Sequence, residues 1–188
     1  MPTTIEQITG FLDDEGMKYR VEDGIIRTGF HTSTYRDVDG DPGLALVIKL
    51  EDLESEGEFL KVIAPNVYKY PDGPHKAALF QLLLMISWDT KMMQYEYDVR
   101  DGEVRAIMEF PIADSTLTKR QLMFCLHGLA ALADENHEAI VAAMSKGELP
   151  KRDDDDEEMA AMWREFQEFV EWKKRSASEP DGDHGLPG

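Results

Sequence analysis

The chain has 188 residues, of which 42% are hydrophobic, and its 38 acidic residues against 20 Lys and Arg give a net charge of −18. This length and hydrophobic content predict one domain with a packed core and an extension. The acidity argues against a nucleic acid or an anionic membrane surface as partner, because phosphate contacts need clustered Lys and Arg. Cys125 is the single cysteine, which excludes an intramolecular disulfide. The first residues lack the basic start and apolar run of a signal peptide, so we expect a soluble cytoplasmic protein.

Residues 3–15 have the pattern of a short amphipathic helix. Thr3 and Glu6 have the spacing of a capping box, in which a threonine hydroxyl accepts a backbone N–H of the first turn. Apolar residues then recur on one helical face. Gly16 suits the left-handed position just past a helix end.

A hairpin and two further strands are predicted next. The dipeptide Asp23–Gly24 favours a type I′ turn, because both turn residues must adopt positive φ, and this turn pairs Val21 with Ile26. A polar, turn-rich loop follows. Residues 43–53 and 58–64 then have the pattern of strands of mostly buried character.

The segment 75–88 is the most hydrophobic part of the chain, with ten apolar residues among fourteen. Residues 65–73 are expected to cross over to it, and Pro74 suits the first turn of a helix. Its apolar spacing is helical but leaves no clean polar face, so both sides need a cover. We expect one side to lie on the sheet. At about 1.5 Å per residue the helix is about 21 Å long, too short to span a membrane.

A second hairpin follows the central helix. Residues 93–99 and 104–110 alternate between apolar and polar side chains, and Asp101–Gly102 again favours a type I′ turn. This turn implies three pairs on the core face and one opposite-charge pair on the other face: Val99 with Val104, Tyr97 with Ala106, Tyr95 with Met108, and Asp98 with Arg105.

A long helix is predicted over residues 118–146. Thr118 and Gln121 have capping-box spacing, and Gly147 suits the helix end. Leucines recur at helical spacing, and Cys125 lies on this apolar face without a positive neighbour. We therefore interpret Cys125 as a small core residue and not as a nucleophile.

The composition changes after residue 149, so we predict a folded domain over 1–149, an acidic linker with an amphipathic helix over 150–175, and a disordered tail over 176–188. The amphipathic helix either docks on the domain or binds a partner in a groove. Its aromatic face consists of Trp163, Phe166 and Phe169.

Residues that could bind a metal or catalyse a reaction are scarce. The acidic segment 37–41 has the spacing of a calcium loop, but Pro42 stands at the turn glycine and Ile48 at the bidentate glutamate. The run 153–156 better fits favourable charge at a helix start. The five histidines have no metal-ligand spacing. We therefore assign no catalytic, cofactor-binding or metal-binding residue, and predict that the protein is not an enzyme.

The predicted order is helix, strands, helix, hairpin, helix, which indicates an α+β fold with an antiparallel sheet of five to six strands and helices packed on it. This order resembles the YbjN-type family of bacterial sensory transduction regulators, whose fold is shared by the type III secretion chaperones. The resemblance covers about residues 3–146 and includes no catalytic signature. The matching segments are the first helix ending at Gly16, LALVIKLEDL, EFLKVIA, LFQLLLMIS, DVRDGEVRAIMEFPI and LTKRQLMFCLHGLAALADE.

The resemblance implies a non-enzymatic interaction module, either a regulator or a chaperone-like protein. Type III chaperones dimerise partly through their central helix and bind an extended segment of an effector. We accordingly expect a homodimer that binds a protein partner and uses no cofactor. The second apolar side of helix 75–88 would be covered by another copy, a client segment or the chain's own aromatic helix. That side is expected to consist of Phe80, Leu83, Leu84 and Trp88.

Two alternatives stay open. An immunity-type or inhibitor protein would use its acidity to neutralise a basic partner. A metal-dependent enzyme would use the segment 37–41 or carboxylates near Glu51.

Overall fold

A computed structural model of the chain describes residues 3–53, 57–112, 115–150, 164–165, 167–168 and 171. The chain divides into two units, Met1–Leu149 and Pro150–Gly188. The described residues between 164 and 171 are helical. The aromatic face predicted for this region lies outside the described residues, as do the acidic run 153–156 and the tail 176–188.

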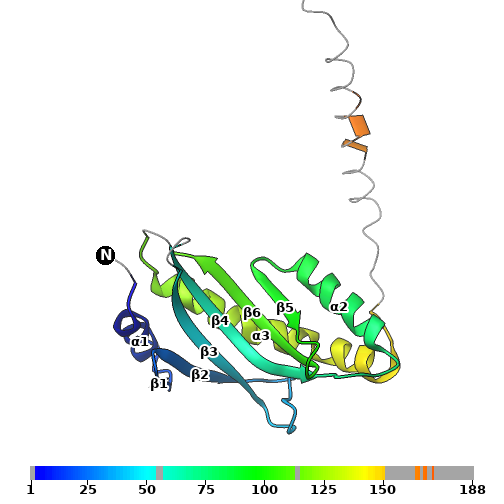
Figure 1. Cartoon of the computed structure of the whole chain (residues 1–188), viewed down its shortest axis with the longest axis horizontal. Coiled ribbons are helices and arrows are strands. Elements are labelled where there is room, and N and C mark those ends of the chain that lie inside the picture. The colour runs from blue at the N-terminus through cyan, green and yellow to red at the C-terminus, as the bar shows by residue number, and fades with distance from the viewer. Residues whose placement is uncertain are drawn as a thin grey trace, which may run out of the picture. The chain divides into compact units, whose positions relative to one another are not determined.

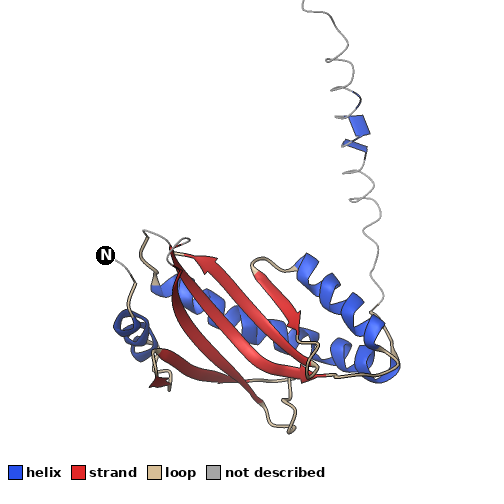
Figure 2. Cartoon of the chain, viewed as in Figure 1, coloured by secondary structure: helices blue, strands red, loops and turns tan. Residues whose placement is uncertain are grey.

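The first unit is an α+β fold, as predicted. Six strands form one antiparallel sheet in the order β1-β2-β3-β4-β6-β5, and helix α3 runs behind it in the view of Figure 1. Figure 2 shows the same helices and strands by type. The elements are α1 (Ile5–Asp14), β1 (Arg20–Glu22), β2 (Ile25–His31), β3 (Gly43–Leu53), β4 (Gly57–Lys69), α2 (Lys76–Asp89), β5 (Met93–Tyr97), β6 (Glu103–Pro111) and α3 (Lys119–Lys146).

The core lies between the sheet and α3. Alternate residues of each central strand point to the same face, and residues three or four apart on α3 point back at them. These side chains are almost fully buried: Leu46, Ile48, Val62 and Met108 from the sheet, and Leu122, Leu126 and Leu129 from α3. The capping box of Thr118 and Gln121 and the left-handed Gly147 bound α3 as predicted.

Helix α1 is capped by Thr4 and not by Thr3. The Gln7 N–H donates to Thr4 Oγ1 at 3.2 Å. Thr3 is buried, and its hydroxyl accepts the N–H of Leu117 at 3.0 Å. The predicted capping box of Thr3 with Glu6 is therefore wrong by one residue, because a backbone group distant in sequence occupies the Thr3 hydroxyl.

Strand β4 does not stop before Pro65 but continues to Lys69. Its pairing with β6 shifts register just after Ala64, and Asn66 has a φ of 50°. The Asn66 N–H donates to a Glu103 carboxylate oxygen at 2.9 Å. The prediction of a crossover beginning at residue 65 is wrong, because a bulge accommodates a proline that would interrupt a regular ladder.

The second hairpin has a register two residues away from the predicted one. Strand β5 ends at Tyr97, which pairs with Val104, and Glu96 pairs with Arg105. The Arg105 Nε donates to Glu96 Oε2 at 2.6 Å. The predicted pairing of Asp98 with Arg105 is therefore wrong, and so are the three predicted pairs on the core face.

Tertiary contacts explain this register. The Tyr70 N–H donates to the Gly102 carbonyl at 2.8 Å, and a Cβ added to Gly102 would lie 2.2 Å from backbone atoms of Pro71. A type I′ turn requires positive φ at both central residues. Gly102 has a φ of 78°, but the residue before it has no positive φ. The loop 98–102 instead packs against the residues that follow β4. At Asp23–Gly24 both residues have positive φ, and the predicted pairing of Val21 with Ile26 is confirmed.

Candidate functional site

Helix α2 lies beside the edge strand β5 and against α3 (Figure 1). Its start adjoins the end of α3, where a Cβ added to Gly147 would lie 2.7 Å from His75 Nδ1. Its end adjoins β5, where Thr90 Oγ1 donates to the Met93 carbonyl at 3.0 Å. The expected contact with the sheet is thus mainly with the edge strand, because α3 already covers the sheet face. His75 is the N-cap, so Pro74 precedes the helix and does not lie in its first turn.

The inner side of α2 belongs to the core of the unit. Four apolar side chains on this side are buried: Leu79, Leu82, Leu83 and Ile86. Leu83 was predicted for the outer side, but it is only 6% exposed. A partner could not reach it without opening the helix from the core.

The outer side of α2 carries a stripe of exposed, uncharged residues. The stripe consists of Ala77, Gln81, Leu84 and Trp88, which we call the α2 strip. Their separations of four, three and four residues place them on one helical face. Leu84 is 72% exposed and Trp88 is 73% exposed. Two large apolar side chains on one helix face, both almost open to solvent, form an apolar patch that the unit itself leaves uncovered.

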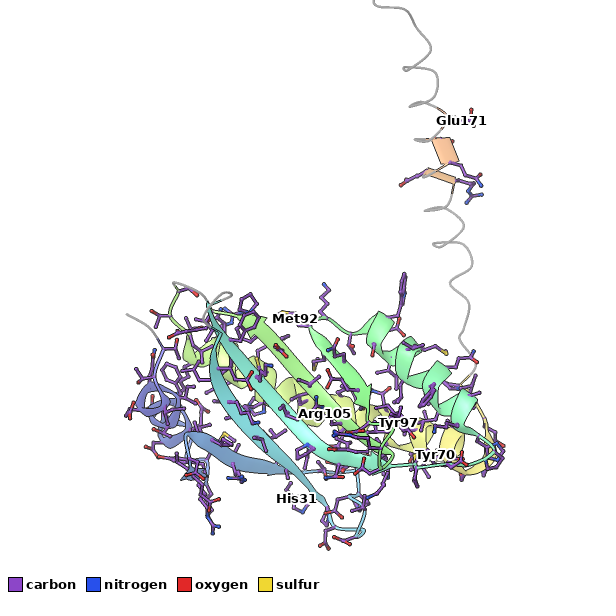
Figure 3. All side chains as sticks on the ribbon, viewed as in Figure 1. His31, Tyr70, Met92, Tyr97, Arg105 and Glu171 are labelled. Atoms are coloured by element: carbon purple, nitrogen blue, oxygen red, sulfur yellow. The ribbon has the colours of Figure 1, made fainter. Side chains whose placement is uncertain are left out.

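Phe80 lies at the flank of the α2 strip and is engaged within the unit. Its ring centroid is 4.8 Å from that of Tyr97, in an edge-on contact. Lys76 Nζ lies 4.9 Å from the Tyr97 centroid, and hydrogen bonding with Tyr97 raises the pKa of Lys76. The Tyr97 hydroxyl donates to the Tyr70 carbonyl at 3.0 Å, and Figure 3 shows both tyrosines at the same end of the sheet. The contact of Phe80 with Tyr97 therefore packs α2 against β5.

A small apolar pocket of about 270 Å³ lies where the turn after α2 approaches the first turns of α3. Met92 and Phe124 line it and are 57% and 56% exposed. Cys125 also lines it, and burial raises the pKa of its thiol to about 12. The thiol therefore stays protonated at neutral pH, which fits the interpretation of a core residue. Figure 3 shows Met92 in the turn between α2 and β5.

The structure thus separates the residues predicted for the interface. Leu84 and Trp88 share the α2 strip, while Phe80 and Leu83 do not lie on it. Sequence reasoning missed Phe124, although its position off the leucine face of α3 was visible in the helical spacing. No local pattern predicted the exposure of Met92, which has a φ of 64°.

No group of three or more His, Cys, Asp or Glu residues in the described part of the chain is arranged to hold a metal ion. The segment 37–41 has a structural explanation, because Asp37 Oδ1 accepts the N–H groups of Asp39 at 2.9 Å and Asp41 at 2.8 Å. The hydrogen bonds close this turn. None of the described helices has the length and apolarity to cross a membrane.

Comparison with solved structures finds a similarity to YbjN, a proposed transcription regulator from E. coli. The identity is 12% and the TM-score is 0.49, over 71% of this chain and 91% of that chain. No protein-family model and no curated protein matches the chain. Membership of the YbjN-type family therefore stays a prediction.

Proposed function

We propose that this protein is a non-enzymatic interaction module, of a regulator or chaperone-like kind, that forms a homodimer through the α2 strip and binds a protein partner as that dimer. The observation that carries the proposal is the exposure of Leu84 and Trp88 on one face of a helix whose other face is buried. Large apolar side chains gain free energy when they are covered, and tryptophan is enriched at the centres of protein interfaces.

The absence of charge on the α2 strip favours a second copy as its cover. Each chain has a net charge of −18, so two copies repel one another over most of their surface. None of the four strip residues is ionisable. When two copies meet at this strip, no strip carboxylate of one copy lies opposite a strip carboxylate of the other. This helix face is therefore a suitable place for self-association.

The sizes of the strip residues also suit two-fold pairing. A two-fold interface places the same patch of both copies face to face. If the two helices run antiparallel about the midpoint of the strip, Trp88 of one copy faces Ala77 of the other. A large side chain then lies opposite a small one at each end of a contact about 17 Å long.

The mass of the full chain in solution tests this proposal. Light scattering at tens of micromolar protein should give about twice the chain mass of 21.4 kDa. Leu84→Glu and Trp88→Glu should each give the mass of one chain with an unchanged circular dichroism spectrum, because both side chains are exposed. Leu83→Glu would be unsuitable, since a charge at this buried position disrupts the core.

Val99→Glu is the matched control. Val99 is 81% exposed in the loop 98–102 and lies outside the α2 strip, so it receives the same charge at an equally open apolar position. This variant should keep the dimer mass. A single-chain mass for the unaltered protein at every concentration would contradict the proposal, and so would a dimer that survives both strip substitutions.

A further inference from the structure

A further partly apolar site lies where the loop between β2 and β3 approaches the end of β4 and α3. Its volume is about 600 Å³, within the range of small-molecule sites. We call it the loop pocket, because the loop between β2 and β3 forms one wall. The other walls come from the end of β4 and from α3. Its lining residues are Arg36, Asp37, Val38, Val67, Tyr68, Lys69, His137, Val141 and Met144.

The walls of the loop pocket include apolar side chains that are partly open to solvent. Val38 is 60% exposed and Val141 is 42% exposed, and they approach the pocket from the loop and from α3. Val67 is buried and contributes to the floor. Two exposed valines from different elements thus line one concavity, which can accept the apolar body of a ligand.

The loop wall is held in place by α3. The Asp134 carboxylate accepts the N–H groups of Ser33, Thr34 and Tyr35 at 3.0, 2.9 and 2.8 Å. Burial opposes ionisation of Asp134, but these three bonds and the nearby Arg36 outweigh it and lower the pKa of the carboxyl. The anchored loop gives the pocket a preformed shape, so a ligand would not have to order it on binding.

The charged side chains that line the pocket leave one positive charge in excess. Arg36 and Lys69 are cationic, and Asp37 is anionic. Asp37 already accepts two backbone N–H groups of its own turn, which disperse its charge. Lys69 Nζ is 3.9 Å from Asp101, with both side chains about half exposed, so this ion pair is weak. Arg36 Nη1 also donates to the Tyr35 carbonyl at 2.7 Å, and Asp134 and Glu138 lie near Arg36 and His137 without lining the pocket. The one excess positive charge among the lining side chains suits a single carboxylate better than a phosphate dianion.

The floor of the pocket supplies hydrogen-bonding groups. The Tyr68 hydroxyl and His137 Nδ1 are 3.2 Å apart. Burial and the nearby Arg36 lower the pKa of His137 against the opposing effect of Asp134 and Glu138, so the imidazole is neutral at pH 7. When Tyr68 donates to Nδ1, the imidazole proton resides on Nε2, which can donate to a ligand oxygen.

A buried hydroxyl without a partner lies near this floor but does not line the pocket. Burial raises the pKa of the Tyr95 phenol, and the nearby Tyr35 adds to this effect. The Tyr35 hydroxyl donates to the Val67 carbonyl at 3.0 Å. Among the described residues, the buried Tyr95 hydroxyl has no hydrogen-bond partner. A buried polar group of this kind marks a place for water or for a function.

We infer that the loop pocket binds a small amphipathic carboxylate, whose apolar body lies against Val38, Val67 and Val141 and whose carboxylate lies between Arg36, Lys69 and the imidazole of His137. This inference is independent of the α2 strip. The expected ligand carries one negative charge on a compact apolar body.

Three probes of the same apolar body test the inference. They are 4-phenylbutyrate, 4-phenylbutanol and 4-phenylbutylamine, which carry a negative charge, no charge and a positive charge. Amide chemical shifts of the full chain, followed by NMR up to millimolar probe, should move at residues 36–38, 67–69 and 137–144. The butyrate should bind roughly fivefold or more tightly than the alcohol, the increment of a partly exposed ion pair, and the amine most weakly.

Variants separate specific binding from general hydrophobic attraction. Arg36→Gln should weaken butyrate binding roughly fivefold and leave alcohol binding unchanged. Arg100→Gln, which removes an exposed arginine from the other hairpin, should change neither. Val141→Asp should weaken binding of the butyrate and the alcohol, because it places a charge against the apolar body of both probes. The inference is overturned if the butyrate shifts no resonance of the pocket, if the alcohol binds as tightly, or if the two arginine variants behave alike.

Discussion

The α2 strip and the loop pocket both expose large apolar side chains, but they differ in the groups around them. On the α2 strip, Leu84 and Trp88 lie on a convex helix face with no ionisable neighbour on the strip itself. In the loop pocket, Val38 and Val141 line a concavity together with two cations, the carboxylate of Asp37 and a neutral histidine. A convex, uncharged face suits a protein surface of similar shape. A concave site with a few convergent polar groups suits a small molecule.

The largest expected effect contrasts the two sides of α2. Leu83→Ala removes buried volume from the core, so we expect the free energy of unfolding to fall by about 2–4 kcal/mol. Leu84→Ala should change it by less than about 0.5 kcal/mol, because this side chain is exposed. Urea unfolding should be measured in a Trp88→Glu background, where the proposed pairing is absent. Similar losses for both leucines would contradict the division of α2 into a buried and an open side.

The anchor of the loop pocket gives the next effect. Asp134→Ala leaves three backbone N–H groups without their acceptor, and we expect a loss of about 1–3 kcal/mol of stability. Hydrogen exchange at Ser33, Thr34 and Tyr35 should accelerate, while the α2 strip stays unchanged. Glu138→Ala is the control, an exposed carboxylate four residues further along α3. Equal exchange in both variants would show that Asp134 does not hold the loop.

The same carboxylate predicts a pH dependence. The pKa of Asp134 is lowered in the folded state, so its contribution to stability is fully present above the unfolded value of about 3.9 and is lost as pH falls through the folded pKa. Acid unfolding of Asp134→Asn should therefore be less steep in this range than that of the unaltered protein. Parallel acid-unfolding curves would contradict this.

The smallest effect contrasts the two sites through ionic strength. A tenfold rise in salt shortens the Debye length about threefold. Binding of 4-phenylbutyrate should weaken by about threefold, because screening reduces its attraction to Arg36 and Lys69. The dimer should become slightly tighter, because salt screens the repulsion between two chains of net charge −18. Isothermal calorimetry and light scattering measure the two trends, and a shared direction would contradict the distinction between the sites.

The sequence predicted those features that neighbouring residues determine. The cap of α3 at Thr118, its end at Gly147 and the turn at Asp23–Gly24 depend on local backbone geometry, and all three are confirmed. Distant contacts determined the features that were predicted wrongly. The Leu117 N–H donates to the Thr3 hydroxyl, and the backbone just after β4 packs closely against Gly102.

The candidate sites show the same limit. Helical spacing alone predicted that segment 75–88 has more apolar surface than one contact can cover. It could not distinguish Leu83 from Leu84, because the all-round apolar pattern gives no inner side until α3 and β5 are in place. The loop pocket was invisible in the sequence, since its residues come from segments around positions 37, 68 and 140 that only the fold brings together.

Trp88 itself reports most directly on whether a second copy covers the α2 strip. Trp163→Phe and Trp172→Phe leave Trp88 as the single tryptophan of the full chain. Its fluorescence emission should shift to shorter wavelength as protein concentration rises, in step with the change in mass from one chain to two. Emission typical of solvent exposure at every concentration would contradict the account. So would short-wavelength emission from a chain that stays monomeric, because its own residues would then be the cover.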